Sequence, residues 1–148
     1  MCWCVALLTV VINVVIHAQA IHWVSNRKNR RVKINLSQTV FIMLCLIITH
    51  ILEISIFAFG YQLILQSSDF GFLNGLEGAS FTDYLYFSAV VFTTLGFGDI
   101  VPLGFIRLYV SVEALTGLSL IAWSMSSAFV VFQNKTCLLY TSDAADEV

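Results

Sequence analysis

The chain has 148 residues, of which 59% are hydrophobic and only 11% are charged, and its mean hydropathy is +0.89. A water-soluble fold of this length has too little interior to hide so much apolar surface, so that class is excluded as the default. The formal net charge of −2 is too small to indicate a charged partner. The composition predicts an integral membrane protein whose surroundings are the lipid bilayer.

The first apolar run, from about Val5 to Val24, is long enough to cross a bilayer as a helix. Four polar residues interrupt it: Asn13, His17, Gln19 and His22. A secretory signal peptide is the alternative, but no basic residue precedes the run and a basic cluster follows it. We therefore predict a retained helix with its N-terminus outside the cell.

Five of the seven basic residues stand together after this run: Arg27, Lys28, Arg30, Arg31 and Lys33. Such a cluster can bind nucleic acid or anionic lipid, but between two apolar segments it is typical of a cytoplasmic loop. No nucleic-acid partner is therefore expected. Residues 1–35 are predicted to form an N-terminal transmembrane helix and its basic cytoplasmic loop.

Two further runs, from about Leu36 to Leu65 and from about Phe105 to Phe132, are also long enough to span. With the basic loop inside, the polar stretch from Gln66 to Ser80 lies outside and the C-terminus returns to the cytoplasm. The predicted fold class is an all-α membrane protein with three transmembrane helices. The expected location is the plasma (inner) membrane, crossed several times.

A shorter apolar stretch, between Thr82 and Thr94, connects two points on the outer side and is too short to cross. We expect a re-entrant helix that dips into the membrane and returns. Non-helical backbone at membrane depth is tolerated only where protein buries it or where it lines a water-filled path. This stretch therefore predicts a pore.

Residues 93–99, with the sequence Thr-Thr-Leu-Gly-Phe-Gly-Asp, end this stretch and are called the glycine loop below. Removing water from a cation takes a ring of oxygen dipoles, and backbone carbonyls can all face one way only if alternate residues adopt unusual backbone angles. Gly96 and Gly98 do so without a Cβ penalty. A phosphate-binding glycine loop is the alternative, but such loops follow a strand and open a helix.

The segment from Tyr86 to Pro102 resembles the pore loop of potassium channels, whose signature is Thr-Val-Gly-Tyr-Gly-Asp. The resemblance implies a homotetramer with a selectivity filter made of Thr94, Leu95, Gly96, Phe97 and Gly98. It implies that K⁺ binds at Thr94, Leu95, Gly96 and Phe97. It also implies that the filter is supported at its base and mouth by Thr93, Asp99 and Tyr86.

Two positions depart from the family signature. Leu95 replaces Val, which keeps the carbonyl group, and Phe97 replaces Tyr, which removes a hydroxyl that helps to hold the filter open. We expect ion selectivity to survive and filter stability to change. Tyr86 stands where the family often has Trp, and its hydroxyl either bonds Asp99 or only packs beside it.

The short helix before the glycine loop has a predicted electrostatic role. Its carbonyl end, near Thr93, favours a cation in the central cavity, and Ser80 or Thr82 caps its opposite end, where Asp83 lies. Three carboxylates are expected to make the outer mouth acidic: Asp69, Glu77 and Asp99. Ordinary surface charges are the alternative for the first two.

Gly117 lies in the middle of the last apolar run, where related channels often carry a gating hinge. Glycine permits a kink, but close helix packing is an equally weighted alternative. The runs Glu113–Gly117 and Trp123–Phe129 resemble small bacterial pore-domain proteins with an extra N-terminal helix.

Four ionisable residues fall inside the predicted spans: His17, His50, Glu53 and Glu113. Such residues are costly in lipid and face protein or water. His50 and Glu53 are three residues apart and share a helical face, as a regulatory proton site or as a structural hydrogen bond. Glu113 is placed to buttress the re-entrant helix.

The last residues, from Cys137 to Glu147, resemble a translated sequencing adapter. Their polar composition is not expected to continue the preceding helix. We therefore predict a pore domain at residues 36–135 and a non-native tail at residues 136–148.

The function expected from these features is passive, potassium-selective conduction through a tetrameric pore. The alternatives are a non-selective cation channel and a non-conducting haem- or metal-binding membrane protein that uses His17, His22 and His50. An enzyme is not expected, because no nucleophile, base and orienting group fall together. No cofactor is expected beyond the permeant K⁺ ions.

Overall fold

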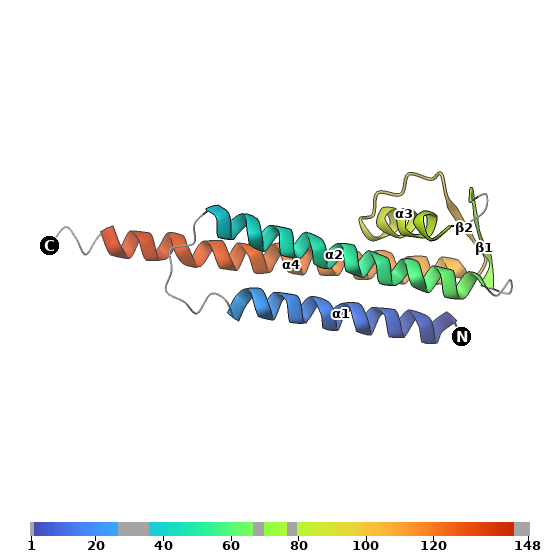
Figure 1. Ribbon diagram of the computed structural model, residues 1–148, viewed down its shortest axis with the longest axis horizontal. Helices are drawn as coiled ribbons and strands as arrows, with labels where there is room; N and C mark the ends of the chain where they lie inside the picture. The colour runs from blue at the N-terminus through green and yellow to red at the C-terminus, as the bar shows by residue number, and fades with distance from the viewer. Residues whose placement is uncertain (1, 27–35, 67–69, 77–79, 144–148) are drawn as a thin grey trace.

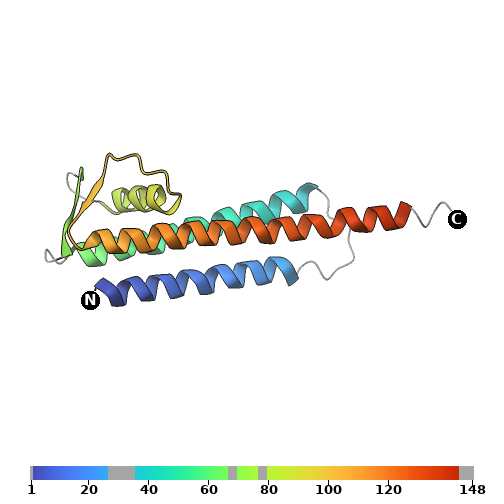
Figure 2. The same cartoon turned by 180° about the vertical axis from the view of Figure 1, so that it is seen from behind.

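The structure is a computed structural model and describes residues 2–26, 36–66, 70–76 and 80–143. Three long helices run side by side: α1 (Cys2–Asn26), α2 (Leu36–Leu65) and α4 (Ile106–Asp143) (Figure 1). A short helix, α3 (Phe81–Phe92), packs against α2 and α4 at one end of this bundle. The N-terminus lies at that same end and the C-terminus at the other, as both views show (Figure 2).

Each long helix is apolar and long enough to cross a membrane, over Trp3–Asn26, Ser37–Leu65 and Ile106–Val130. The prediction of three such helices is confirmed. Large apolar side chains such as Leu7 and Ile48 are more than half exposed, whereas the polar side chains of Asn13 and His17 are fully buried. Polar groups inside and apolar groups outside are what a bilayer demands of a helix bundle.

The predicted boundaries hold for α2 and need correction for α4. The last helix was expected to stop near Phe132 and the tail was not expected to continue it, but α4 extends to Asp143. Residues 133–143 contain neither glycine nor proline. Without a breaker, a polar sequence continues a helix that is already formed, because each added residue costs little.

Two short strands, β1 (Phe72–Asn74) and β2 (Val101–Leu103), pair antiparallel, with Leu73 opposite Pro102. The all-α prediction therefore missed a small sheet. Three residues are too few to show strand alternation, and proline argues against a central strand. A two-stranded sheet has only edge strands, where proline is tolerated. The sheet joins the segment before α3 to the segment after the glycine loop.

Of the two predicted capping residues, Ser80 and Thr82, the structure has Ser80 as the N-cap residue of α3. The carboxylate of Asp83 accepts the Ser80 backbone N–H at 2.8 Å and the Ser80 hydroxyl at 2.9 Å. These two donors, the backbone N–H first, hold the pKa of Asp83 below its usual value. The ionised carboxylate stabilises this end of the helix, which carries the positive pole of the helix dipole.

Aromatic side chains fix α3 against the long helices. The Tyr61 ring meets Phe87 of α3 edge-on, with 5.2 Å between ring centroids, and meets Tyr109 of α4 at 4.9 Å. Phe57 lies between Tyr109 and Phe92, the last residue of α3, at centroid distances of 5.9 and 6.3 Å. All five side chains are buried. Edge-to-face contacts of this kind add stability and define orientation, so α3 has a fixed place on the bundle.

Candidate functional site

The glycine loop leaves directly from the C-terminal end of α3. The backbone N–H groups of Thr93, Thr94 and Leu95 still donate to carbonyls of α3, at 3.1, 2.9 and 3.0 Å. The loop then turns away from the helix and reaches β2. Its first residues are thus anchored to α3 by hydrogen bonds of the helical type.

The backbone angle φ alternates in sign along the loop. It is 59° at Thr94, 57° at Gly96 and 81° at Gly98, whereas no other described residue of the loop has a positive value. Glycine adopts positive φ at no steric cost. A Cβ atom at Gly96 or Gly98 would meet no other atom of the chain within 4 Å. The backbone angle, and not a lack of space, is therefore what requires glycine here.

Thr94 is the member of this series that the sequence reasoning missed. A β-branched residue at positive φ is an outlier that costs about 1–2 kcal/mol. Backbone strain of this kind persists where the surrounding structure imposes it and gathers at functional sites. Counting back two residues from Gly96 in the expected alternation would have identified Thr94.

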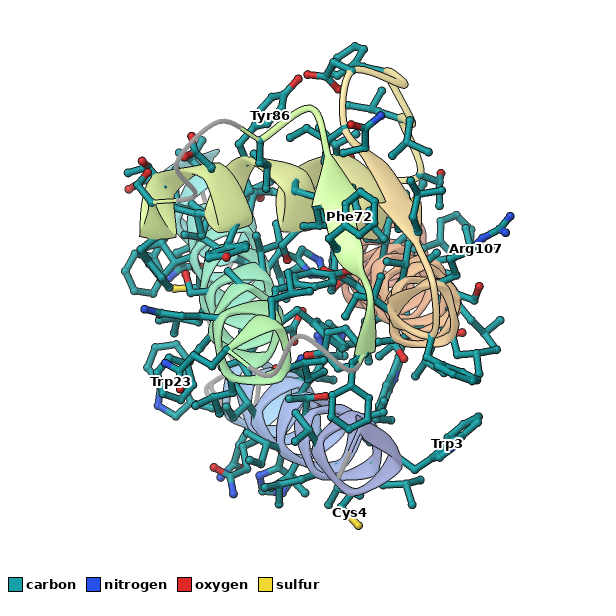
Figure 3. All side chains as sticks on the ribbon, turned by 90° about the vertical axis from the view of Figure 1, so that its right-hand side faces the viewer. Trp3, Cys4, Trp23, Phe72, Tyr86 and Arg107 are labelled. Atoms are coloured by element: carbon teal, nitrogen blue, oxygen red, sulfur yellow. The ribbon has the colours of Figure 1, made fainter. Side chains whose placement is uncertain are left out.

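Tyr86 ties α3 to the far end of the loop. Its hydroxyl donates to Asp99 Oδ2 at 2.7 Å, and Asp99 Oδ1 accepts the Ile100 N–H at 3.0 Å. Of the two alternatives for Tyr86, the structure thus contains the hydrogen bond. This bond, with a smaller effect of desolvation, raises the pKa of Tyr86, so the phenol stays protonated at neutral pH. Figure 3 shows Tyr86 on the side of α3 away from the long helices.

Behind α3, the Glu113 side chain is fully buried and joins three helices. Tyr61 of α2 donates to Glu113 Oε2, and the hydroxyl of Ser88 in α3 lies against Glu113 Oε1. The Ser88 hydroxyl is also 2.9 Å from the carbonyl oxygen of Ile54. Glu113 thus contacts α3 as the sequence suggested.

The hydrogen-bond donors and acceptors around Glu113 can be counted for its protonated state. The Ser88 hydroxyl has one proton and two acceptor oxygens within reach, those of Ile54 and Glu113. If Glu113 is protonated, its hydroxyl donates to Ser88, Ser88 donates to Ile54, and every group has a partner. A neutral carboxylic acid also avoids a buried charge. A neutral Glu113 therefore leaves none of these groups without a partner.

We expect the Glu113→Gln variant to be about as stable as the parent chain and the Glu113→Ala variant to be less stable. Glutamine keeps the volume and supplies both a donor for Ser88 and an acceptor for Tyr61, so its cost stays below about 1.5 kcal/mol. Alanine leaves two buried hydroxyls without this partner, which costs about 1–3 kcal/mol. Thermal unfolding of both variants in detergent measures the difference. Equal melting temperatures would show that Glu113 does not hold α3.

Gly117 lies where α4 packs against the last residue of α3. A Cβ atom on Gly117 would stand 2.4 Å from the carbonyl oxygen of Phe92 and 2.9 Å from its ring. This contact supports the close-packing alternative at Gly117. Helix α4 is continuous through this position, and the gating hinge stays a prediction.

Several predicted site residues lie outside the described residues. These are the basic loop at residues 27–33 and two of the acidic mouth residues, Asp69 and Glu77. Among the predicted intramembrane groups, the structure brings together His50 and Glu53, with Nδ1 and Oε2 2.9 Å apart, and confirms that pair. It adds His17, which the sequence gave no reason to place there, because it comes from another helix.

In a comparison with known protein families, residues 45–134 match the family described as ion channel. No curated protein and no solved structure matches the chain. The matched region covers most of α2, all of α3, the glycine loop and the apolar part of α4. It is more than half of the chain, and the glycine loop lies well inside it.

Proposed function

This chain belongs to the ion channel family, and we propose that it is one subunit of a homotetramer that conducts potassium ions passively across the plasma membrane. In this proposal α3 is a re-entrant pore helix and residues 36–135 form the pore domain. The N-terminus and the glycine loop face the outside, whereas the basic loop and the C-terminus face the cytoplasm. No catalysis and no cofactor take part.

The observation that carries the proposal is the alternating sign of φ at Thr94, Gly96 and Gly98. When φ alternates in sign from one residue to the next, successive peptide units face the same way. Their carbonyl oxygens can then line one side of the glycine loop. A potassium ion that enters such a strand exchanges water oxygens for carbonyl oxygens. The Thr94 hydroxyl adds the innermost oxygen.

One copy of the glycine loop cannot surround an ion. Leu95 and Phe97 are 62% and 66% exposed in the single chain. An exposed aromatic and an exposed leucine on a short loop favour contact with further copies of the chain. Four loops around one axis enclose the ion and cover these side chains. On the same axis, the exposed residues Leu115, Leu118, Met125 and Phe129 of α4 would line the inner part of the pore.

The helix arrangement supplies the electrostatics that the proposal needs. Helix α3 ends at the base of the glycine loop, and its carbonyl end carries partial negative charge that stabilises a cation. Asp99, held by Tyr86, places a carboxylate at the opposite end of the loop. A cation therefore meets favourable potential at both ends of the filter.

Reconstitution into liposomes tests the proposal. We expect potassium flux to exceed sodium flux by at least about tenfold, a free-energy difference of about 1.4 kcal/mol, and barium to block it. Cross-linking in the same membranes should stop at a tetramer. Equal flux of the two ions would replace the proposal by a non-selective cation channel. The absence of flux from correctly folded protein would refute conduction altogether.

A further inference from the structure

A second group of polar side chains lies in the bundle interior, outside the glycine loop. His17 of α1 and His50 and Glu53 of α2 make up this histidine cluster. His17 Nδ1 lies 2.8 Å from Glu53 Oε1, and His50 Nδ1 lies 2.9 Å from Glu53 Oε2. The His17 and Glu53 side chains are fully buried, and that of His50 is 19% exposed. One ligand atom from each residue lies within 4.8 Å of the other two.

Ser124 of α4 closes the cluster from the other side of the two rings. Its hydroxyl oxygen lies 3.3 Å from His17 Nε2 and 3.2 Å from His50 Nε2. If both Nδ1 atoms donate to Glu53, both Nε2 atoms are bare, and one serine proton can satisfy only one of them. In this protonation state, one of the two Nε2 atoms therefore receives no hydrogen bond from Ser124.

A divalent cation removes the conflict. With the metal bound by Glu53 and the two Nδ1 atoms, both Nε2 atoms carry hydrogen and donate to the two lone pairs of the Ser124 oxygen. Donation of the outer ring N–H to a neighbouring oxygen is the usual way in which a protein orients metal-binding histidines. Ser124 is already in place for that role.

We infer that His17, His50 and Glu53 form a binding site for a divalent transition metal of the zinc class. Two imidazoles and one carboxylate are a ligand set that zinc accepts, with a fourth position left open. Metal–ligand distances of 2.0–2.2 Å put the donor atoms of a tetrahedral site about 3.3 Å apart. The two short N–O pairs open by about half an ångström to reach that separation, and the wider separations in the cluster, which are within 4.8 Å, close toward it.

Asn13 provides a further polar group next to the histidine cluster. It precedes His17 by one helical turn and its side chain is fully buried. Its Nδ2 donates to the Glu53 carbonyl oxygen at 3.4 Å, whereas its Oδ1 is the one buried side-chain polar atom of the described residues without a hydrogen-bond partner. An amide oxygen beside a cluster of two histidines and a carboxylate is available to a bound metal or to its water ligand.

A groove approaches the histidine cluster from the end of the bundle opposite α3. This groove of about 230 Å³ lies between the long helices, and Trp123, Ser126 and Ser127 are among the residues that line it. The Trp123 ring also packs against His17, with 5.4 Å between ring centroids. Trp123 thus lies between the groove and His17.

A metal at this site would join α1 to the part of the chain that carries the pore. Its ligands come from α1 and α2, and Ser124 belongs to α4. His50 also packs against Phe92, the last residue before the glycine loop, with ring centroids 5.8 Å apart. Occupancy would therefore fix the extra N-terminal helix and stiffen the base of α3.

Binding of Zn²⁺ and Co²⁺ to the purified full chain tests the inference without a flux measurement. Metals are first removed with a chelator, and Zn²⁺ is then added. We expect one bound Zn²⁺ per subunit by elemental analysis and a higher melting temperature than that of the metal-free protein. Co²⁺ should give the visible absorption of a four-coordinate nitrogen and oxygen site. Wild-type protein that binds neither ion would overturn the inference and leave the cluster as a hydrogen-bonded network.

Variants identify the ligands. We expect His17→Ala and Glu53→Gln to weaken Zn²⁺ binding at least about 100-fold, and Ser124→Ala about tenfold because it only orients the histidines. The matched control is His22→Ala, since His22 is exposed on the same helix. Equal affinity of His17→Ala and His22→Ala would refute the site. Thiolate-to-cobalt bands in the ultraviolet would assign the metal to cysteine and refute it as well.

Discussion

Replacing Gly96 by alanine is expected to abolish potassium flux while leaving the helix bundle folded. Gly96 has a φ of 57°, where an L-residue with a Cβ atom costs about 1–2 kcal/mol. Because the four copies of the proposed tetramer must adopt this backbone together, the proposed filter loses about 4–8 kcal/mol, at least about 700-fold in its population. A methyl group would also narrow the ring of carbonyls. Flux of K⁺ from liposomes measures the loss.

A matched substitution separates backbone strain from a change in side-chain packing. Leu95→Val alters the neighbouring side chain and keeps the carbonyl groups, at a position whose φ is not positive. We expect this variant to conduct K⁺ at close to the parent rate. Helix content of the Gly96→Ala protein should match the parent, and its melting temperature should fall only by what about 1–2 kcal/mol of loop strain costs, because no atom of its own chain lies within 4 Å of the added Cβ. Undiminished flux through Gly96→Ala would contradict a carbonyl-lined filter.

The long helices and the short helix before the glycine loop were predictable because they depend on local sequence. A run of apolar residues long enough to span predicts a membrane helix whatever it packs against, and α2 has the predicted bounds Leu36–Leu65. A short helix was also predicted between Thr82 and Thr94, and α3 fills most of that stretch, from Phe81 to Phe92; its re-entry into the membrane stays a prediction. The N-cap at Ser80 and the backbone angles of Gly96 and Gly98 follow from residue type.

The interactions that hold the site in place were not predictable, because they join distant parts of the chain. Glu53 meets His17 across 36 residues, and Glu113 meets Tyr61 across 52. A polar residue in an apolar run shows that it needs a partner, but its partner depends on how the helices rotate against each other. His50 and Glu53 were paired correctly because they are three residues apart on one helix.

These distant contacts converge on α3. Glu113 holds the middle of α3 through Ser88, and the aromatic rings of Tyr61 and Phe57 pack against its buried face. Gly117 allows α4 to touch its last residue. Because the glycine loop is hydrogen-bonded to the end of α3, any shift of this helix moves the first oxygens of the proposed filter. The position of α3 on α4 therefore matters for conduction although no ion touches it.

Gly117→Ala is accordingly expected to reduce both stability and potassium flux. Alanine favours a helix over glycine by about 1 kcal/mol, but the added Cβ would overlap the Phe92 carbonyl oxygen at 2.4 Å. That oxygen belongs to the backbone, so the whole end of α3 must shift, at a cost of about 3 kcal/mol. The clash outweighs the gain in helix propensity. We expect a lower melting temperature in detergent and at least about tenfold less flux, since about 1.4 kcal/mol suffices for that.

The sign of the change in melting temperature decides between the two hypotheses for Gly117. If the residue were only a hinge, alanine would stiffen α4, so the melting temperature would rise while flux fell. If it is a packing contact, both quantities fall together. Ser111→Ala is the control, because Ser111 is exposed on α4 and its hydroxyl bonds only the Arg107 carbonyl oxygen of the same helix, at 2.9 Å. A raised melting temperature in Gly117→Ala, with Ser111→Ala unchanged, would favour the hinge and refute the contact with Phe92 as the reason for glycine.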